Sequence, residues 1–271
     1  FNGIVQLNGD LLLSSNKLKI ILINFRPIEN LTLLDLSSNE IELIKNTTFN
    51  HLKMLKSLDL SNNHILSVEK GSFDSLNNLE SLNLKNNELK ELEKNIFNNL
   101  NNLTYLFISN NFLNTIDSSL FKLINIQLEG NQILKINNGT FLNMKSLTDL
   151  SLNSLGLLEL DSYSFFGLEN LKFLSLSMNK LIRIKKRVFY GLNDLQNLFL
   201  DINEIAELDY DCFESLEKLT LLDLSFNRLI QLDNEHFKYF RLLIELNLLN
   251  NSFSILRNNT FKSLKILNSI D

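Results

Sequence analysis

Hydrophobic and polar positions alternate along this chain in a pattern that returns every 24 residues. In the stretch 31–54, which has the sequence LTLLDLSSNEIELIKNTTFNHLKM, apolar residues stand at positions 1, 4, 6, 11, 14, 19 and 22, and Asn stands at position 9. The stretch 55–78 repeats the same frame. A period of this length is the sequence signature of a repeat architecture, in which copies of one structural element are stacked in a row.

The Asn residues at position 9 mark the register of the repeats. Their spacing is 23 or 24 residues, except for one step of 20 before Asn131 and one missing mark, where Leu155 replaces the Asn. We therefore predict about eleven repeats over residues 8–266 and a partial twelfth from 267, in a single domain 1–271 that lacks terminal caps. The Asn residues of this ladder are Asn16, Asn39, Asn63, Asn87, Asn111, Asn131, Asn179, Asn203, Asn227 and Asn251.

Each repeat predicts one short strand, because positions 4 and 6 flank a single outward residue. The next copy, stacked about 4.8 Å away, would pair with that strand in a parallel ladder and close a continuous core. The Asn amide after the strand can satisfy backbone groups that the turn buries. Phe at position 19 of all eleven repeats fills the opposite, wider side. The pattern predicts a curved α/β solenoid, with a parallel β-sheet on the concave face and mostly irregular or short helical segments on the convex side.

The amino-acid composition is biased as expected for a repeat protein, and it excludes a disulfide-stabilised scaffold and a membrane-spanning helix. Leu and Asn number 63 and 42, and together they fill more than a third of the 271 residues. The single cysteine, Cys212, excludes a disulfide scaffold within the chain. No apolar run approaches the roughly 18 residues that a membrane span needs. The sequence from Phe1 shows no signal-peptide pattern.

The repeat LxxLxLxxNxLxxLxxxxFxxLxx resembles the typical 24-residue leucine-rich repeat of Toll-like receptor, chaoptin-like and Slit-type ectodomains. Plant-type repeats carry Gly and Pro within the repeat, and the single proline, Pro27, argues against them. The resemblance implies a horseshoe that binds other molecules, usually proteins, without catalysis and without a cofactor.

Extracellular members of that family usually end in cysteine-rich caps, which this sequence does not show. Because the open end of a solenoid exposes its core, we expect the chain to be a segment of a longer protein. Membrane contact is then expected only through segments outside it. The alternative is a complete protein with a frayed or shared end.

The repeat is irregular in two neighbouring places. The repeat 103–122 has lost four residues after Phe121, on the convex side, and Leu155 lacks the amide of the ladder. Losing one buried, hydrogen-bonded amide costs on the order of 1 kcal/mol. The two changes indicate either a bend that shapes a binding surface or simple drift in a tolerant array.

Charge is uneven on the predicted concave face, where positions 3, 5 and 7 point outward and positions 2 and 8 lie at the margins. These positions hold nine acids and three bases, which gives −6 against −5 for the whole chain. Such a face disfavours nucleic acid and favours a protein partner with a basic or mixed surface. The alternative is that Asp at position 5 is a habit of the repeat. The acids are Asp10, Asp35, Asp59, Glu80, Glu129, Asp149, Asp201, Asp223 and Glu245, and the bases are Lys56, Lys85 and Lys172.

Aromatic residues interrupt this polar face in two places, one strand in the first half of the chain and neighbouring strands in the second. Large apolar groups on an open surface are candidates for a binding patch, because interface anchors are enriched in aromatics. The alternatives are cover by a neighbouring loop or glycan, or isolated exposure. The candidates are Tyr105, Phe107, Phe173 and Phe199, with Met178, Ile202 and Phe226 at the margin.

Six N-glycosylation sequons occur, although the abundance of Asn means that chance alone predicts nearly as many. Three of them, at Asn46, Asn138 and Asn258, share position 16 on the back of the predicted arc, where a glycan could project into solvent. A glycan on Asn250 would instead obstruct the concave margin. The acceptors are Asn30, Asn46, Asn102, Asn138, Asn250 and Asn258.

Catalytic and metal-binding constellations are missing from the sequence. The histidines His51, His64 and His236 lie in no nucleophile motif, and no phosphate-binding loop is present. Cys212 and His236 share position 18 of adjacent repeats and are candidate neighbours. A semi-buried structural Cys is a better interpretation than a thiolate pair, and two ligands fall short of a zinc site.

A basic run lies on the descending or convex side of one repeat. It is a candidate contact for anionic sugars or a membrane surface, although a solvated charge run is the simpler interpretation. The run comprises Arg183, Lys185, Lys186 and Arg187.

These observations favour a non-enzymatic recognition module. By resemblance, we expect an extracellular or cell-surface receptor or adhesion segment, in innate immunity or cell adhesion, that binds a protein ligand or co-receptor on its concave face. The alternative is an intracellular or secreted leucine-rich-repeat scaffold for protein–protein interaction. A homodimer is a further candidate assembly.

Overall fold

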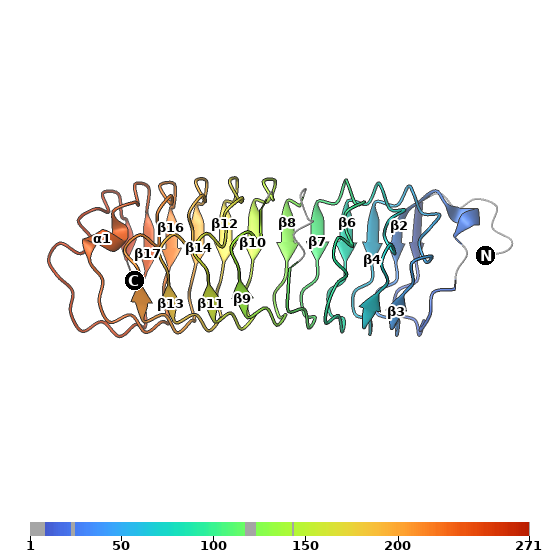
Figure 1. Ribbon diagram of the computed structural model, residues 1–271, viewed down its shortest axis with the longest axis horizontal. Coiled ribbons are helices and arrows are strands. Elements are labelled where there is room, and N and C mark those ends of the chain that lie inside the picture. The colour runs from blue at the N-terminus through green and yellow to red at the C-terminus, as the bar shows by residue number, and fades with distance from the viewer. Residues whose placement is uncertain (1–8, 23–24, 117–122, 143, 271) are drawn as a thin grey trace. The chain divides into compact units, whose positions relative to one another are not determined.

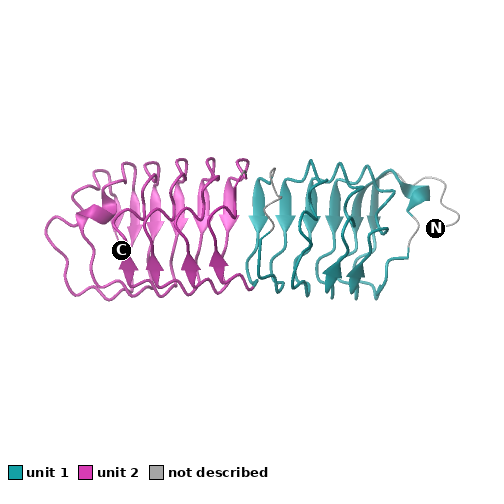
Figure 2. Ribbon diagram, in the orientation of Figure 1, with its two compact units in different colours: residues 1–131 teal, residues 132–271 magenta. Residues whose placement is uncertain are grey.

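The computed structural model describes residues 9–22, 25–116, 123–142 and 144–270. The chain divides into two compact units, unit 1 over residues 1–131 and unit 2 over residues 132–271 (Figure 2). Each unit is a parallel-strand solenoid whose strands follow one another in chain order (Figure 1). This architecture confirms the predicted solenoid, while the assignment of residues 1–271 to a single domain stays a prediction.

The main strands of unit 1 pair with a register that matches the sequence repeat. Leu34 pairs with Leu58, and Leu58 pairs with Leu82, so the step is 24 residues. The step falls to 20 between Leu106 and Ile126, as the spacing of the Asn residues predicted. The strands are β1 (Gly9–Leu12), β2 (Leu31–Asp35), β4 (Ser57–Asp59), β6 (Ser81–Asn83), β7 (Tyr105–Phe107) and β8 (Asn125–Gln127).

The main strands of unit 2 keep the same regular register. Leu150 pairs with Leu174, and the step of 24 continues through Leu246 to Ile270. In most of these strands the middle residue is buried and its two neighbours are more exposed, as the period-two pattern predicted. The strands are β10 (Asp149–Ser151), β12 (Phe173–Ser175), β14 (Asn197–Phe199), β16 (Leu221–Asp223), β17 (Glu245–Asn247) and β18 (Ser269–Ile270).

Short strands at positions 13 and 14 of the repeat form additional parallel pairs, which the hydrophobic pattern does not predict. Helix is scarce among the described residues, as expected, and is found in the 3-10 turn η1 (Arg26–Ile28) and the short helix α1 (Asn234–Phe237). The short strand pairs are β3 (Leu43–Ile44) with β5 (Ser67–Val68), β9 (Lys135–Ile136) with β11 (Glu159–Leu160), and β13 (Arg183–Ile184) with β15 (Glu207–Leu208).

Phe side chains at position 19 form buried rows behind the strands. In unit 1, the rings of Phe49 and Phe73 stack with centroids 6.3 Å apart. In unit 2, the rings of Phe165 and Phe189 stack at 5.8 Å. Each fully buried ring contributes about 1.5–3 kcal/mol through removal of apolar surface from water. Phe121 and the predicted four-residue loss after it lie at residues 117–122, outside the described residues.

The Asn residues at position 9 satisfy backbone groups that the turn buries, as predicted, and they also bridge consecutive repeats. Asn63 donates from Nδ2 to the carbonyl oxygens of Leu36 and Leu60, each at 3.0 Å, and accepts at Oδ1 from the N–H of Ile41 at 3.0 Å. The buried turn therefore leaves these backbone groups hydrogen-bonded. Leu155 occupies the same position as a buried apolar residue.

Candidate functional site

The outward side chains of the main strands form the surface that carries most of the predicted binding residues, and we call it the sheet face. In unit 2, Phe173 on β12 and Phe199 on β14 lie diagonally across from each other, because Phe173 pairs with Asn197 and Ser175 pairs with Phe199. Their ring centroids are 5.3 Å apart, and the ring planes meet at 42°. Both side chains are half-buried. The two rings thus form one apolar spot on the sheet face.

A second aromatic pair lies on the sheet face of unit 1. Tyr105 and Phe107 are both on β7, and their rings stack with centroids 6.4 Å apart. Tyr105 is 45% exposed, whereas Phe107 is half-buried. This pair rests on a single strand, so it offers a narrower apolar surface than the two-strand pair in unit 2.

The residue at position 8 adopts the left-handed conformation whatever its type. Its φ lies between 51° and 57° at Ser, Asn and apolar residues, and it is 69° at Gly130. Gly and Asn tolerate this conformation, whereas a large or β-branched side chain is strained there by about 1–2 kcal/mol. Three successive repeats of unit 2 nevertheless carry exposed apolar residues at this position. We call them the apolar ridge, and they are Met178, Ile202 and Phe226.

The backbone ladder fixes the conformation of the ridge. The N–H of Ile202 donates to the carbonyl oxygen of Ser225 at 3.1 Å, and the N–H of Phe226 donates to that of Leu249 at 2.8 Å. Because the backbone N–H of each ridge residue is bound to the next repeat, φ is held at its positive value and the backbone strain is not relieved. The ridge side chains are 46–56% exposed, so burial of apolar surface offsets the backbone strain only in part. Strained residues of this kind gather at functional sites, which makes the ridge a candidate contact.

Three of the predicted surface acids have a structural contact at the end of a strand. Asp35, Asp59 and Asp223 each accept a hydrogen bond at Oδ1 from the N–H two residues further on, at 2.8–2.9 Å. Asn83 and Asn247 make the same contact from the same position, at 3.1 and 3.0 Å. Asp or Asn at position 5 thus serves as an acceptor for the turn after the strand, so an acid there is not by itself a sign of function. This role was missed in the sequence, although the recurring Asp or Asn at position 5 was its signal.

Two other predicted acids are not engaged in that turn. Asp201, at position 7, accepts a hydrogen bond from the hydroxyl of Ser177. Asp149 is exposed on β10, where the hydroxyl of Thr148 donates to it at 2.6 Å. Their carboxylates lie on the sheet face and do not accept the hydrogen bond that ends a strand.

All six sequon asparagines are exposed side chains. Asn250 differs from Asn46, Asn138 and Asn258 because it stands at position 8 with φ of 55°, next to the sheet face, rather than at position 16. Exposure meets the physical requirement for glycan attachment, and occupancy stays a prediction.

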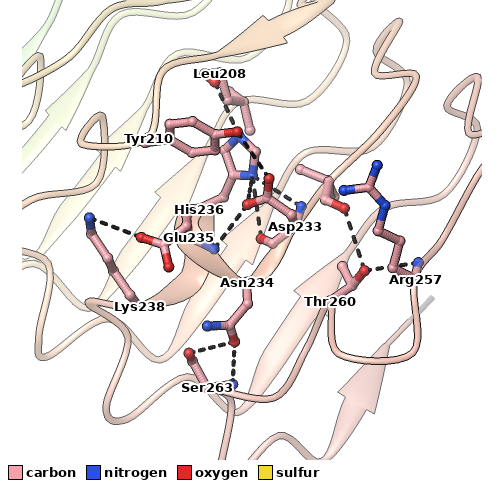
Figure 3. A network of polar contacts seen from close by, with 11 residues as sticks. Leu208, Tyr210, Asp233, Asn234, Glu235, His236, Lys238, Arg257, Thr260 and Ser263 are labelled. Atoms are coloured by element: carbon pink, nitrogen blue, oxygen red, sulfur yellow. Dashed lines mark hydrogen bonds and ion pairs between the residues drawn. The ribbon is translucent and has the colours of Figure 1, made fainter.

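Cys212 and His236 each have a structural role. Burial raises the pKa of the fully buried Cys212 thiol well above its ordinary value, and nearby Asp209 adds to this effect. His236 accepts a hydrogen bond at Nδ1 from the N–H of Asp233 at 3.1 Å, and its Nε2 lies 3.1 Å from the carbonyl oxygen of Leu208 (Figure 3). A protonated Nε2 satisfies that carbonyl. The full burial of the thiol agrees with the interpretation of Cys212 as a structural residue.

Asp233 organises the polar network around His236 (Figure 3). It begins α1 by accepting a hydrogen bond at Oδ1 from the N–H of Glu235 at 2.9 Å, and its Oδ2 lies 3.2 Å from the hydroxyl oxygen of Tyr210. This hydrogen bond raises the pKa of Tyr210, because the carboxylate stabilises the protonated phenol. The Tyr210 ring also lies 5.0 Å from the His236 ring. The network therefore links Tyr210 of one repeat to Asp233 and His236 of the next.

The basic run is largely neutralised by acids of neighbouring repeats, which agrees with the simpler interpretation. Arg183 lies 2.6 Å from Asp209 and 3.1 Å from Glu207, and the hydrogen bond that it donates to Asp209 raises the pKa of Arg183. Arg187 lies 2.9 Å from Glu214, and Lys185 is paired with Glu159. The backbone N–H of Lys186 donates to Asp209.

Within the described ranges, no three His, Cys, Asp or Glu side chains are grouped closely enough to hold a metal ion. Among the same residues, no helix has the length and apolar character required to cross a membrane.

The fold is similar to that of chains in three solved complexes. A chain of the TLR13–ssRNA13 complex has a TM-score of 0.79 and 25% identity, with 98% of this chain and 43% of that chain covered. A chain of the mouse RP105/MD-1 complex has a TM-score of 0.71 and 25% identity, with 99% and 42% covered. The present chain therefore spans less than half the length of either. A chain of the octameric complex of Latrophilin 3, Unc5D and FLRT2 shares the fold at 24% identity, with a TM-score of 0.78 and coverage of 92% and 77%.

Comparison with known protein families gives matches to the family described as Leucine rich repeat at residues 29–89, 77–127, 121–181, 152–205 and 174–229. A search of curated proteins finds no match. The family matches run without a gap from residue 29 to residue 229, which is more than half of the chain. Together with the in-register parallel strands and the Asn ladder, they establish that the chain belongs to the leucine-rich-repeat family.

Proposed function

We propose that this chain is a non-enzymatic recognition module that binds a protein partner on the sheet face of unit 2. The observation that carries the proposal is the contact between Phe173 and Phe199, in repeats that also carry the apolar ridge. Large apolar side chains gathered on an open surface mark interaction sites, and aromatic anchors supply much of the binding energy of protein interfaces.

The charge around this patch indicates the chemistry of the partner. Asp149, Asp201 and Glu245 lie on the sheet face or its margin in unit 2, and Lys172 is the base at a margin position there. An acidic rim around an apolar centre steers and orients a partner with basic groups beside its own apolar anchors. The same rim disfavours the phosphate backbone of nucleic acid.

The similar solved structures support a protein partner as the first choice. RP105 is in complex with MD-1, and FLRT2 is in a complex with Latrophilin 3 and Unc5D. TLR13 is instead in complex with a single-stranded RNA, which makes RNA the principal competing ligand class. We favour protein because the acids of unit 2 outnumber the bases on its sheet face.

The biological setting that fits these features is a receptor or adhesion ectodomain at the cell surface, in innate immunity or cell adhesion. The exposed sequons support it, because they could carry glycans without disturbing the core. Treatment of the protein from its native source with an N-glycosidase tests this setting. A loss of mass supports passage through the secretory pathway, whereas unchanged mass favours the alternative of an intracellular scaffold.

Binding to a panel of purified extracellular proteins tests the sheet-face proposal. The double variant Phe173→Ala/Phe199→Ala is compared with Phe166→Ala, which removes another surface ring, 43% exposed and outside the sheet face. We expect the double variant to weaken binding by about tenfold or more, because two anchors are lost, and the control to bind like the parent. Partners that bind the double variant unchanged would overturn the proposed site.

A further inference from the structure

A second exposed apolar row runs along unit 2, at position 12 of five successive repeats. This position comes three residues after the ladder position and is not part of the main strands. Four of the five residues are Leu or Ile with exposed fractions of 51–58%. We call this row the flank stripe, and its members are Leu134, Leu158, Ile182, Ala206 and Ile230.

The flank stripe is held by backbone hydrogen bonds between repeats. The N–H of Leu158 donates to the carbonyl oxygen of Leu134 at 2.9 Å, and the N–H of Ala206 donates to that of Ile182 at 2.9 Å. The residues that follow pair as β9 with β11 and as β13 with β15. The stripe is therefore a preformed surface, and a partner that covers it meets little cost of ordering the chain.

Charged residues of alternating sign lie directly beside the stripe, at position 13. In chain order they are Lys135, Glu159, Arg183 and Glu207, so each charge is followed by its opposite in the next repeat. Lys135 lies 3.7 Å from Glu159, and Arg183 lies 3.1 Å from Glu207. The sign of the charge thus alternates over these four successive repeats.

An alternating row of this kind is complementary to itself. A two-fold axis midway between two adjacent repeats places the two charges that flank it opposite charges of the other sign in a second copy, whereas an axis through a repeat would oppose like charges. We propose that the flank stripe is a dimerisation surface for a second copy of this chain, with the axis between the repeats of Arg183 and Glu207. In this arrangement Arg183 of one copy faces Glu207 of the other.

The shape of the stripe favours this register over its neighbours. Along the charged row, the register pairs Arg183 with Glu207 and leaves Glu159 opposite the uncharged Gln231. A hollow of about 610 Å³ opens on the flank and is lined in part by Ala206, the smallest member of the stripe, and by Ile230. The proposed axis places Ile182 of one copy opposite Ala206 of the other, so that the larger side chain enters the hollow. It also places Lys180 opposite Glu204, which are exposed and half-buried charges beside the stripe. This surface is distinct from the sheet face and does not depend on the function proposed for it.

Sedimentation equilibrium of the 271-residue chain over a wide range of concentration tests the proposal. We expect reversible dimerisation, and we expect Ile182→Glu to weaken it by about tenfold or more, because a charge would face apolar side chains. Arg183→Glu should weaken it similarly by opposing like charges. Arg241→Glu is the matched control, since it makes the same charge change and breaks the ion pair with Glu217 away from the stripe.

The charge-swapped variant Arg183→Glu/Glu207→Arg keeps the test decisive if a single variant folds poorly. It restores the pair between positions 183 and 207 both within each copy and across the proposed axis, whereas the contact with Asp209 is lost in the single and the double variant alike. The double variant should therefore dimerise more strongly than Arg183→Glu. A protein that is monomeric at every concentration overturns the proposal. So does a dimer that withstands both single substitutions, or one that the swap fails to rescue while circular dichroism shows the variants to be folded.

Discussion

Asn179 accepts a hydrogen bond at Oδ1 from the backbone N–H of Leu155 at 3.0 Å, next to the repeat whose ladder position is apolar. The same oxygen accepts from the N–H of Leu157 at 3.0 Å, as the other ladder residues do from their preceding repeats. Nδ2 meanwhile donates to the carbonyl oxygens of Leu152 and Leu176 at 2.8 and 2.9 Å. The Asn179 amide thus accepts from one additional N–H, that of Leu155, which reduces the free-energy cost of having Leu in place of Asn at position 155.

This relationship predicts that Asn179→Ala destabilises the fold more than Asn203→Ala. Both side chains are buried, and Asn203 accepts at Oδ1 from a single N–H, that of Leu181. The difference in free energy of unfolding should be about 1 kcal/mol, because Asn179→Ala leaves one more buried N–H without an acceptor. Urea denaturation of the two variants measures it, and equal losses would show that the contact with Leu155 contributes nothing.

The strained ridge gives a second prediction, on Ile202→Asn. Asn is tolerated at the left-handed position that Ile202 occupies, so the loss of apolar contact is offset by relief of strain of about 1 kcal/mol. Ile244→Asn is the control, because Ile244 is 38% exposed against 47% for Ile202 and has no positive φ. Thermal or chemical denaturation should show Ile202→Asn to be less destabilising than the control by about that amount. Identical effects would mean that the ridge is not strained.

The acids at position 5 give a third prediction, on Asp35. Asp35→Ala removes the acceptor for the N–H of Ser37 and should lower the free energy of unfolding by about 1 kcal/mol. Asp35→Asn keeps an acceptor, as Asn83 does at the same position. It also removes the repulsion between the like charges of Asp35 and Asp59, which pair across β2 and β4. Asp35→Asn should therefore match or slightly exceed the parent in stability. A loss as large as that of Asp35→Ala would contradict the role in the turn.

The fourth prediction concerns the thiol of Cys212. Burial raises its pKa and so suppresses the thiolate, which is the reactive form. Iodoacetamide or Ellman's reagent at pH values near 8 should leave the thiol of the folded protein unmodified and react promptly after unfolding in guanidinium. Fast modification of the native protein would contradict the structural role and would reopen the interpretation of Cys212 as a reactive group.

Much of the fold could be predicted from sequence because one short pattern fixes it many times over. The pairing of Leu34 with Leu58 follows directly from the repeat step, since a slip of one residue would turn the buried leucines outward. The buried role of the Asn amides followed from their place at the turn. The short strand pairs such as β13 with β15 were missed, because two-residue strands leave no periodic signal.

The candidate site was less accessible to sequence reasoning, because its properties depend on conformation and on contacts between repeats. The register placed Phe173 and Phe199 on neighbouring strands, and the structure adds that their rings touch. The left-handed conformation of Ile202 is imposed by the solenoid turn, not by any preference of Ile. Likewise, the carboxylate of Asp35 appeared to be a free surface charge until its contact with the N–H of Ser37 was visible.

The central claim is that a protein partner docks over the Phe173–Phe199 spot, and photo-crosslinking tests it most directly. A photoreactive phenylalanine analogue is placed at Phe199, or at Phe166 as the control, and the chain is irradiated in complex with its partner from the protein panel. The proposal predicts a covalent adduct with the partner from Phe199 and none from Phe166. An adduct from Phe166 alone, or none from Phe199 while the partner remains bound, would contradict it.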